Sequence, residues 1–270
     1  MRTIITMSAT ALALSAVATP ASATSVNYPA QQSTITYSTN STATSLFGNY
    51  ARATSKVVYD PATDTYTLRD TGSLAITSSF GPSNINSGAS NSTFTVYSKN
   101  SGAETFRLLN KGAGNPLIQL TYVDYGEWKR SSTASGTTNV NDTYVVFGSK
   151  TPGASVPRVG SASYTTVYDG TFVNKTGAFA FNGTGGINAN FVTGGLTYTA
   201  ALSGLPSGAL AIAGSGSIAF NSGNFTASGS SSGYSMNLYG GFYGPAAQEV
   251  GGLFSLRGNG GNGEGAFVGK

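Results

Sequence analysis

Short stretches in which apolar and polar residues alternate make up most of this chain. Alternation with a period of two predicts half-buried β-strands, because successive side chains along a strand point to opposite faces of the sheet. In the second half the pattern returns about every ten residues, with glycine, serine and asparagine between the runs. Clear examples are residues 178–181, 196–202, 218–220 and 236–238. This spacing predicts an antiparallel β-barrel or sandwich.

The second half fits a barrel of about eight strands, whose interior is just filled by side chains. Its many alanines and glycines suit such a narrow interior, although nine candidate strands can be counted, so that one of them is split or wrong. An outer-membrane barrel would give the same alternation, but it needs apolar bands and aromatic girdles on its outside. Here the faces opposite the apolar ones carry serine, threonine and asparagine, which disfavours that alternative.

The first half also predicts β-strands, separated by longer polar loops. Residues 60–64 have the composition of a turn between two of them. The loops are expected at residues 83–92 and 131–141. The strands are expected at residues 56–59, 65–68, 93–97, 106–109, 117–125 and 144–147.

The distribution of charge divides the chain into two domains. Residues 24–270 contain 23 charged residues. Of these, 16 lie in residues 24–155 and seven lie in residues 156–270. Residues 150–157 contain two prolines and a glycine, which is the composition of a linker. We therefore expect an all-β protein in which a β domain at residues 24–155 is followed by a barrel domain at residues 156–270.

Residues 1–23 have the three parts of a secretory signal peptide. Arg2 supplies the basic start, residues 4–18 form an apolar stretch, and residues 21–23 place small side chains at the cleavage site. The apolar stretch is too short for a membrane-spanning helix, and no later segment reaches 18 consecutive apolar residues. We expect the mature protein to begin at Thr24 and to cross the inner membrane.

Cysteine and histidine are both absent from the sequence. Disulfides, thiolate metal sites, cysteine nucleophiles, Ser-His-Asp triads and histidine-ligated haem are therefore excluded. The ten acidic residues are scattered, and no spacing pairs them for glycoside hydrolysis. Without Arg2 the chain holds 13 basic and 10 acidic residues, and no basic cluster exceeds residues 129–130. Nucleic-acid binding is therefore not expected, and these features together predict a non-catalytic protein.

The most specific motif lies near the carboxyl end. Residues 240–254 read GGFYGPAAQEVGGLF, and residues 265–270 read GAFVGK. The first run is a strand, a break at residues 244–245, a short polar turn, and a strand that opens on two glycines. This segment resembles the closing part of the barrel in the transferrin-binding protein B family. Residues 157–164 and 188–204 resemble earlier barrel strands of the same family.

The resemblance implies a two-domain binding protein. In the family a handle domain leans on the barrel, and residues 120–128 resemble part of that handle. Family members are surface lipoproteins and secreted haem carriers, which implies capture of a solute, haem or a host protein, a role in iron or haem acquisition, and an outer-membrane receptor or translocator as partner. Lipoprotein members are anchored through an acylated cysteine, which this chain lacks. We therefore expect a periplasmic or secreted protein without a lipid anchor.

The candidates for ligand binding come from one predicted strand and its end: Tyr122, Tyr125, Trp128, Lys129 and Arg130. Aromatic and arginine side chains together form many interface hot spots, and the basic pair suits the propionates of haem. The alternative is that the single tryptophan packs between the two domains. We expect no cofactor. If the protein does carry haem, either a tyrosine ligates the iron or no protein group does.

The closing motif is expected to be structural. Phenylalanines at positions 242, 254 and 267 have the size and spacing of core residues. We expect the polar turn to plug one end of the barrel, with its glutamate bonded to nearby backbone N–H groups, and the glycine pair to allow close backbone packing. The residues of this motif are Phe242, Tyr243, Gly244, Pro245, Glu249, Gly251, Gly252 and Phe254.

Two functional hypotheses from different classes remain. One is an exported binding protein that captures a solute, a haem-like ligand or a protein through loops on a rigid β scaffold. The other is a structural or adhesive cell-surface protein without a small ligand. An enzyme is a third alternative that no motif supports.

The first testable prediction concerns processing. We expect the exported protein to start at Thr24 and to carry no acyl chain, because residues 21–23 form a cleavage site and no cysteine follows it. Intact mass spectrometry of the exported protein measures this directly. A mass that matches the full chain, or one that includes an added acyl group, would contradict the prediction.

Overall fold

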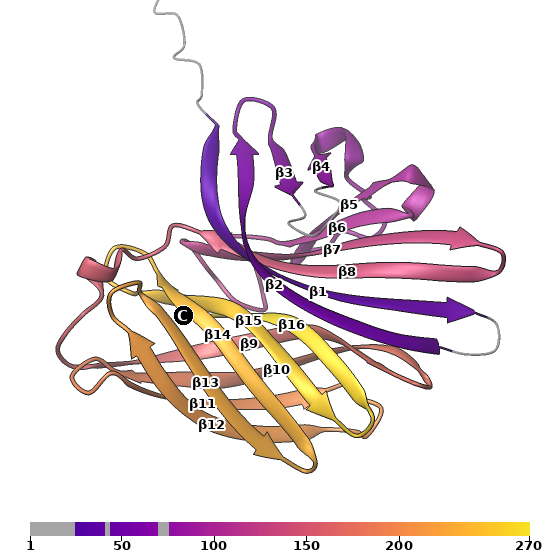
Figure 1. Ribbon diagram of the computed structural model, residues 1–270. Helices are drawn as coiled ribbons and strands as arrows, with labels where there is room; N and C mark the ends of the chain where they lie inside the picture. Colours follow the sequence, from indigo (N-terminus) through magenta and orange to yellow (C-terminus); the bar gives the residue numbers. More distant parts are fainter. Residues whose placement is uncertain (1–24, 41–43, 70–75) are drawn as a thin grey trace, which may run out of the picture.

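The computed structural model describes residues 25–40, 44–69 and 76–270, so the expected signal peptide at residues 1–23 lies outside the described residues. Within the described part the chain is all-β, with three short 3₁₀ segments and no α-helix. Two eight-stranded antiparallel sheets follow one another in the sequence, which confirms the predicted fold class. Figure 1 shows the first sheet lying above the second. No helix among these residues is long and apolar enough to cross a membrane.

The first sheet, which we call the handle domain, has the strand order β4-β3-β2-β1-β8-β7-β6-β5. β1 lies inside the sheet and pairs with both β2 and β8, so the first and last strands of the domain are neighbours. The short strands β4 and β5 form its edges. Its strands are β1 (Val26–Asn40), β2 (Thr44–Asp60), β3 (Thr65–Arg69), β4 (Thr77–Phe80), β5 (Phe94–Lys99), β6 (Glu104–Leu109), β7 (Val123–Ala134) and β8 (Thr137–Gly148), with 3₁₀ segments η1 (Pro82–Asn84) and η2 (Asn100–Gly102).

Two sequence-based predictions for the handle were wrong. The strand expected at residues 117–125 begins only at Val123, because the preceding backbone N–H groups bind a carboxylate of the other domain instead of a neighbouring strand. The loop expected at residues 131–141 is the tip of the β7–β8 hairpin. Ser135 and Gly136 have φ of 49° and 76°, which suits a two-residue hairpin turn. Polar side chains on both faces hid this hairpin from an alternation pattern.

The second sheet is a closed barrel in which β9 pairs with both β10 and β16. It has eight strands, so one of the nine candidates counted in the sequence was wrong. The 3₁₀ segment η3 (Gly153–Ser155) precedes it. Its strands are β9 (Ser161–Asn174), β10 (Gly177–Asn190), β11 (Gly195–Ser203), β12 (Leu210–Ala219), β13 (Asn224–Ser231), β14 (Tyr234–Tyr243), β15 (Glu249–Gly258) and β16 (Gly261–Gly269).

Side chains fill the interior of the barrel, as the alternation predicted. Phe242, Phe254 and Phe267 are at most 1% exposed and belong to one apolar cluster with inward-facing residues from the other strands. Other aromatic rings pack against them in tilted or edge-on arrangements, with centroid separations from 5.3 Å (Phe225 to Phe242) to 6.2 Å (Tyr164 to Phe242). The barrel therefore has a core that is packed with side chains.

The glycine pair of the closing motif allows two backbones to approach each other. A Cβ atom on Gly252 would collide with the backbone of Tyr239 and Gly240 on the neighbouring strand and would lie 2.9 Å from the ring of Phe267. Gly252 pairs with Gly240 in the register of β14 and β15. The structure thus explains the expected role of Gly252 in backbone packing.

The second prediction follows from this core. Phe254→Ala removes a ring that is 1% exposed, and we expect the free energy of unfolding to fall by about 3–5 kcal/mol. Chemical denaturation of the full mature chain measures this change. Val192→Ala is the control, because Val192 is 67% exposed and should change stability by less than about 0.5 kcal/mol. Equal stability of the two variants would show that Phe254 is not a core residue.

Candidate ligand-binding site

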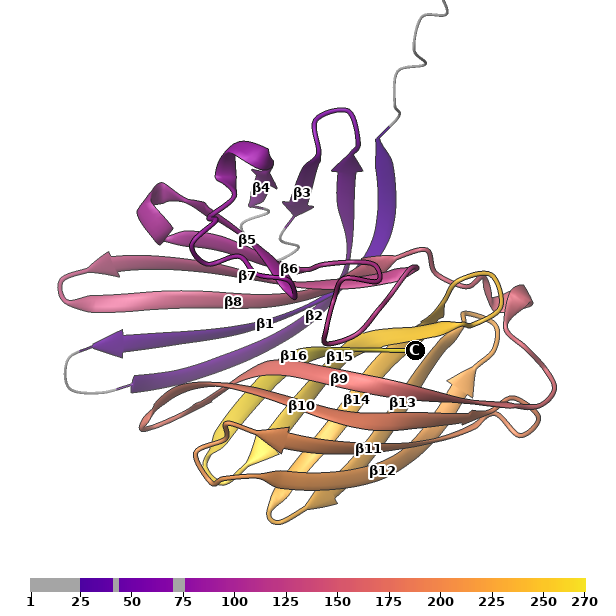
Figure 2. The same ribbon diagram turned by 180° about the vertical axis from the view of Figure 1, so that it is seen from behind.

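The two domains share an apolar seam. The outer faces of β9, β15 and β16 lie against β1, β2, β7, β8 and the loop before β7, and Figure 2 shows β15 and β16 directly below the handle. The residues of this seam are at most 5% exposed, so the handle covers one side of the barrel. The handle contributes Leu109, Leu120, Val123, Tyr125, Tyr144 and Val146, and the barrel contributes Val167, Tyr243, Leu253, Ala266 and Val268.

Glu249 fastens this seam at the end of the closing turn. Its carboxylate accepts hydrogen bonds from the backbone N–H groups of Thr121, Tyr122 and Val123 at 2.7, 2.8 and 3.0 Å. The side chain is buried, so these bonds form away from water. The sequence analysis expected Glu249 to bind backbone N–H groups, and the structure shows that these groups belong to the other domain.

The turn that carries Glu249 closes one end of the barrel. Gly244 has φ of 85°, a conformation that favours glycine. Ala247 is 4% exposed and belongs to the apolar cluster of the barrel. Its carbonyl oxygen accepts a hydrogen bond of 2.6 Å from the hydroxyl of Tyr164. The turn is therefore tied to the barrel core on one side and, through Glu249, to the handle on the other.

A cluster of charged side chains lies in the same seam. Arg107 on β6 contacts both Glu127 on β7 and Asp169 on β9, so one guanidinium links the handle to the barrel. Lys129 lies 2.7 Å from Glu127 and 3.3 Å from Asp142 on β8. The cations and carboxylates alternate in this cluster, which is the arrangement that buried charges require.

Hydroxyl groups complete the cluster across the domain boundary. Thr171 on β9 donates to Asp142 at 2.8 Å, and the Tyr144 hydroxyl lies 3.0 Å from that of Thr171. Tyr125 donates to Asp169 at 3.2 Å. These hydroxyl groups extend the cluster from β7 and β8 of the handle to β9 of the barrel, while Asp142 Oδ1 is buried without a hydrogen-bond partner among the described residues.

Two carboxyl groups of the cluster, Glu127 and Asp142, have pKa values that are shifted in opposite directions. Burial raises the pKa of Glu127, but Arg107 and Lys129 outweigh this effect and lower it to about 2. Burial raises the pKa of Asp142 to about 7, and nearby Glu127 acts in the same direction while Lys129 opposes it. Near neutral pH, Glu127 is therefore ionised, whereas Asp142 is partly protonated.

A cleft of about 340 Å³ opens at the edge of this cluster, between the handle and the outer face of the barrel. Arg107 and Asp169 both line it, and the Arg107 guanidinium carbon is 4.5 Å from the centroid of the Phe94 ring. Cavities of this size are at the lower end of the range for small-molecule sites. The lining residues are Phe94, Arg107, Leu117, Tyr125, Tyr168, Asp169, Asn182, Gly183, Thr184, Ala201 and Ser203.

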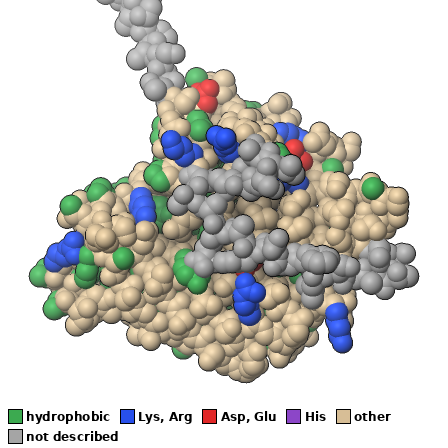
Figure 3. Space-filling view, in the orientation of Figure 1, with side chains coloured by type: hydrophobic (Ala, Val, Ile, Leu, Met, Phe, Trp, Pro, Cys, Tyr) green, Lys and Arg blue, Asp and Glu red, His purple; other side chains and the backbone are tan. Residues whose placement is uncertain are grey.

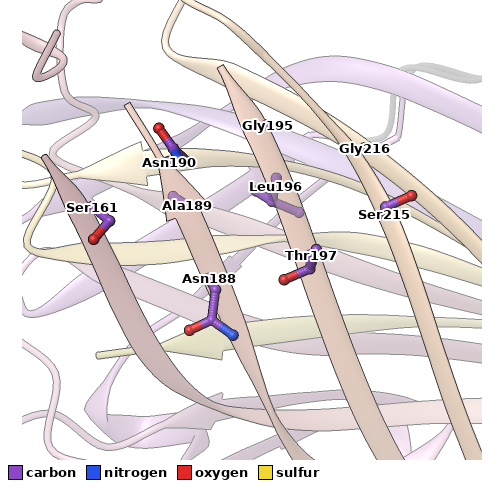
Figure 4. Close-up of a pocket in the computed structure, with 9 residues that line it drawn as sticks. All are labelled: Ser161, Asn188, Ala189, Asn190, Gly195, Leu196, Thr197, Ser215 and Gly216. Carbon is purple, nitrogen blue, oxygen red and sulfur yellow. The ribbon is translucent and has the colours of Figure 1, made fainter. Parts of the chain in front are cut away.

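A second, shallower depression of about 480 Å³ lies on the barrel surface, shown in Figure 4. It crosses β9 to β12, and Gly195 and Gly216 contribute only backbone to it. Figure 4 shows the side chains of Ser161, Asn188 and Thr197 on adjacent strands. None of the nine lining residues is charged.

A comparison of the sequence with protein-family models and with curated proteins finds no match. Solved structures do match. Transferrin-binding protein B of Neisseria meningitidis is 16% identical, with a TM-score of 0.52 over 88% of this chain and 43% of that one. A mutant of the Haemophilus parasuis protein of the same name is 15% identical, with a TM-score of 0.54 over 88% and 45% of the two chains.

The chain has a transferrin-binding protein B-like fold. This confirms, for the fold, the resemblance found in the sequence. The chain spans 43–45% of the length of these two solved transferrin-binding proteins.

In this transferrin-binding protein B-like fold the five predicted ligand-binding residues do not form one site. Trp128 is fully buried in the core of the handle, where its indole N–H donates to Glu104 at 3.0 Å and Arg130 covers its ring at 4.2 Å. The alternative that Trp128 packs between the two domains is therefore wrong. Tyr125 occupies that position instead. Lys129 belongs to the charged cluster, and Tyr122 lies beside the closing turn. Only Tyr125 reaches the cleft.

Sequence reasoning missed the charged residues that line the cleft. Arg107 follows Phe106 and precedes two leucines, and Asp169 follows Tyr168 in a half of the chain that holds only seven charges. A charged residue inside an apolar strand rarely lies buried without a partner. That signal marked Arg107 and Asp169 as members of a buried pair, but only the fold shows that they belong together.

The third prediction concerns the Glu249 carboxylate. Glu249→Ala leaves three backbone N–H groups without their acceptor, and we expect stability to fall by roughly 3 kcal/mol. Because the contact joins the domains, the seam should open to amide hydrogen exchange at residues 121–123 before the barrel unfolds. Hydrogen exchange with mass spectrometry measures both effects. The exposed neighbour Gln248→Ala is the control, and equal exchange in the two variants would contradict the role assigned to Glu249.

The fourth prediction concerns Asp142. Its pKa of about 7 in the folded protein lies above the value of about 3.9 in an unfolded chain. Between these two values the folded protein binds the extra proton, so this group makes stability fall as the pH rises from about 4 to 7. The asparagine side chain of the Asp142→Asn variant is neutral at every pH in this range. The variant should therefore lack the part of the pH dependence of stability that Asp142 causes.

Thermal unfolding of both proteins from pH 4.5 to 8 measures the effect. The melting temperature of the variant minus that of the wild type should rise by at least about 2 °C, since 1 kcal/mol corresponds to roughly 2–4 °C for a chain of this size. Parallel curves would show that Asp142 is ionised throughout this range.

Proposed function

We propose that this protein is an exported, non-catalytic binding protein that captures a solute, a haem-like ligand or a partner protein. The observation that carries the proposal is the open cleft at the seam of a transferrin-binding protein B-like fold. The seam holds the walls of this cleft in fixed positions, because Glu249 and Arg107 both join the two domains. A preorganised cleft loses little free energy to ordering when a ligand binds.

The chemistry of the chain favours binding over catalysis. The seam carboxylates Glu127, Asp142 and Asp169 each lie against Arg107 or Lys129. Histidine and cysteine are absent from the whole sequence. The acid that faces the cleft is thus held in an ion pair and is not poised for proton transfer.

The proposed location is the periplasm or the cell exterior. The signal-peptide pattern at residues 1–23 supports export, and the lack of cysteine argues against a lipid anchor. The solved proteins of this fold are named for binding transferrin, a host iron carrier, which supports a role in iron or haem acquisition. An outer-membrane receptor or translocator is the proposed partner in that process.

Haem is one of the ligands that the proposal covers, and Tyr122 and Tyr125 are the candidate ligands of its iron. The Tyr125 hydroxyl binds Asp169 in the seam and is 1% exposed, so it can reach haem iron only if the domains separate. Tyr122 is half-buried beside the closing turn. Tyr122 is therefore the better of the two candidates. A high-spin ferric spectrum that is lost in Tyr122→Phe would support it.

The second candidate function is a structural or adhesive role at the cell surface. The observation that favours it is the uncharged outer face of the barrel, because a broad polar surface without a deep pocket suits weak contacts with other surfaces. Figure 3 shows the barrel half of one face as mostly tan, the colour of uncharged polar side chains and backbone, with isolated Lys and Arg side chains.

Native mass spectrometry of the protein purified from its own host separates these functions. A bound solute, haem or protein that dissociates on unfolding and raises the melting temperature when added back supports the binding protein. Titration of the wild type and of Tyr122→Phe with haemin tests whether haem is the ligand. A protein that is recovered without ligand, is not stabilised by haemin and adheres to cell surfaces would support the structural role instead.

A further inference from the structure

Two residues that line the cleft, Arg107 and Asp169, carry a hydrogen-bond donor and an acceptor that bind no other described residue. Arg107 uses Nε and Nη2 for Glu127 and Asp169, while its Nη1 donates to no residue in the described part of the chain. Asp169 uses Oδ2 for Arg107 and Tyr125, and its Oδ1 accepts from no described residue. The ion pair holds both free groups in place. A bound molecule can therefore accept from the guanidinium and donate to the carboxylate at once.

One wall of the cleft is apolar. The Phe94 ring packs against Tyr125 at a centroid separation of 6.0 Å and against the guanidinium of Arg107. Leu117 beside it is 44% exposed, which is high for a large apolar side chain next to a cleft. This wall suits a flat apolar surface such as the C–H face of a sugar ring.

The opposite wall is polar and uncharged. It consists of Asn182, Thr184 and Ser203 on the outer faces of β10 and β11, and the Ser203 hydroxyl lies 3.2 Å from Asn182 Oδ1. Short hydroxyl and amide side chains both donate and accept hydrogen bonds. They are complementary to a ligand whose own groups do the same, which describes hydroxyls better than phosphates or carboxylates.

The charges around the cleft favour a neutral ligand. In the seam the cations Arg107 and Lys129 face the three carboxyl groups of Glu127, Asp142 and Asp169, so the cluster has no excess of positive charge to attract an anion. Residues 176–248 contain no Asp, Glu, Lys or Arg at all. A charged ligand would lie against β10 and β11 with no counter-ion to offset its desolvation.

The same two strands connect the cleft with the depression of Figure 4. On β10 the outward positions run from Asn182 and Thr184 in the cleft to Asn188 and Asn190 in the depression. At about 3.4 Å per residue, these eight steps span roughly 27 Å. Thr197 on β11 pairs with Asn188 along this path. The polar track is thus long enough for several linked sugar units.

We propose that the cleft between handle and barrel binds one residue of a neutral oligosaccharide, and that the chain of the oligosaccharide continues along β10 and β11 to the depression. The sugar ring stacks on Phe94, and two of its hydroxyls bind Arg107 Nη1 and Asp169 Oδ1. Asn182 and Ser203 bind the opposite edge. This inference rests on the proposed binding function and names the class of its ligand.

An array of immobilised neutral, sialylated and sulfated oligosaccharides, probed with labelled mature protein, tests the inference. We expect binding to neutral glycans alone, with little dependence on salt, because no ionic contact is released. Phe94→Ala and Asn182→Ala should each weaken binding about tenfold, which corresponds to 1.4 kcal/mol. Asn182 is exposed, so its variant tests the site without a risk to folding. Thr226→Ala, on the outer face of β13, is the matched control and should bind as the wild type does.

Several results would overturn the inference. These are binding restricted to sialylated or sulfated glycans, no binding to any neutral glycan, or neutral-glycan binding that both cleft variants leave unchanged. A dimer in solution that Asn188→Lys dissociates would assign the outer face to a second copy of the chain and would also overturn it. If no neutral glycan binds but a protein or haem is recovered with the native protein, this inference fails and the proposed binding function stands.

Discussion

The three hydrogen bonds from the handle backbone to Glu249 are the contact on which the arrangement of the two domains depends. A carboxylate that accepts several backbone N–H groups away from water makes strong, directional bonds. Its acceptor sits at the start of β15, and its donors sit just before β7. One side chain thereby determines where the barrel turn ends, where the handle strand begins and how the seam residues meet. The cleft exists because this contact fixes the distance between its walls.

The charged cluster gives the seam specificity that apolar packing lacks. Apolar faces can slide past each other at little cost, whereas Arg107 has to meet both Glu127 and Asp169 to offset its own burial. A buried ion pair adds little net stability to a protein. Removing one of its two partners is nevertheless costly, because the other charge is then left buried and unpaired. The cluster therefore selects one docking geometry, and two of its residues, Arg107 and Asp169, line the cleft.

Much of the fold could be read from the sequence, and the candidate site could not. Alternation located most barrel strands and core phenylalanines such as Phe254, because one buried face leaves a period of two. The β7–β8 hairpin was missed because residues 131–141 are polar on both faces. The cleft was missed because Arg107 and Asp169 are 62 residues apart and meet only across the seam. Trp128 was predicted to bind a ligand because tryptophan is common in interface hot spots, but its side chain lies in the core of the handle.

Each sheet is completed by the pairing of its first and last strands. β1 pairs with β8 in the handle, and β9 pairs with β16 in the barrel. Pairs so distant in sequence form slowly, because long loops must close before any contact forms. A chain that emerges from a membrane pore with its amino end first cannot close the barrel until β16 has left the pore. If the chain is exported as proposed, its barrel therefore folds only after β16 has left the pore.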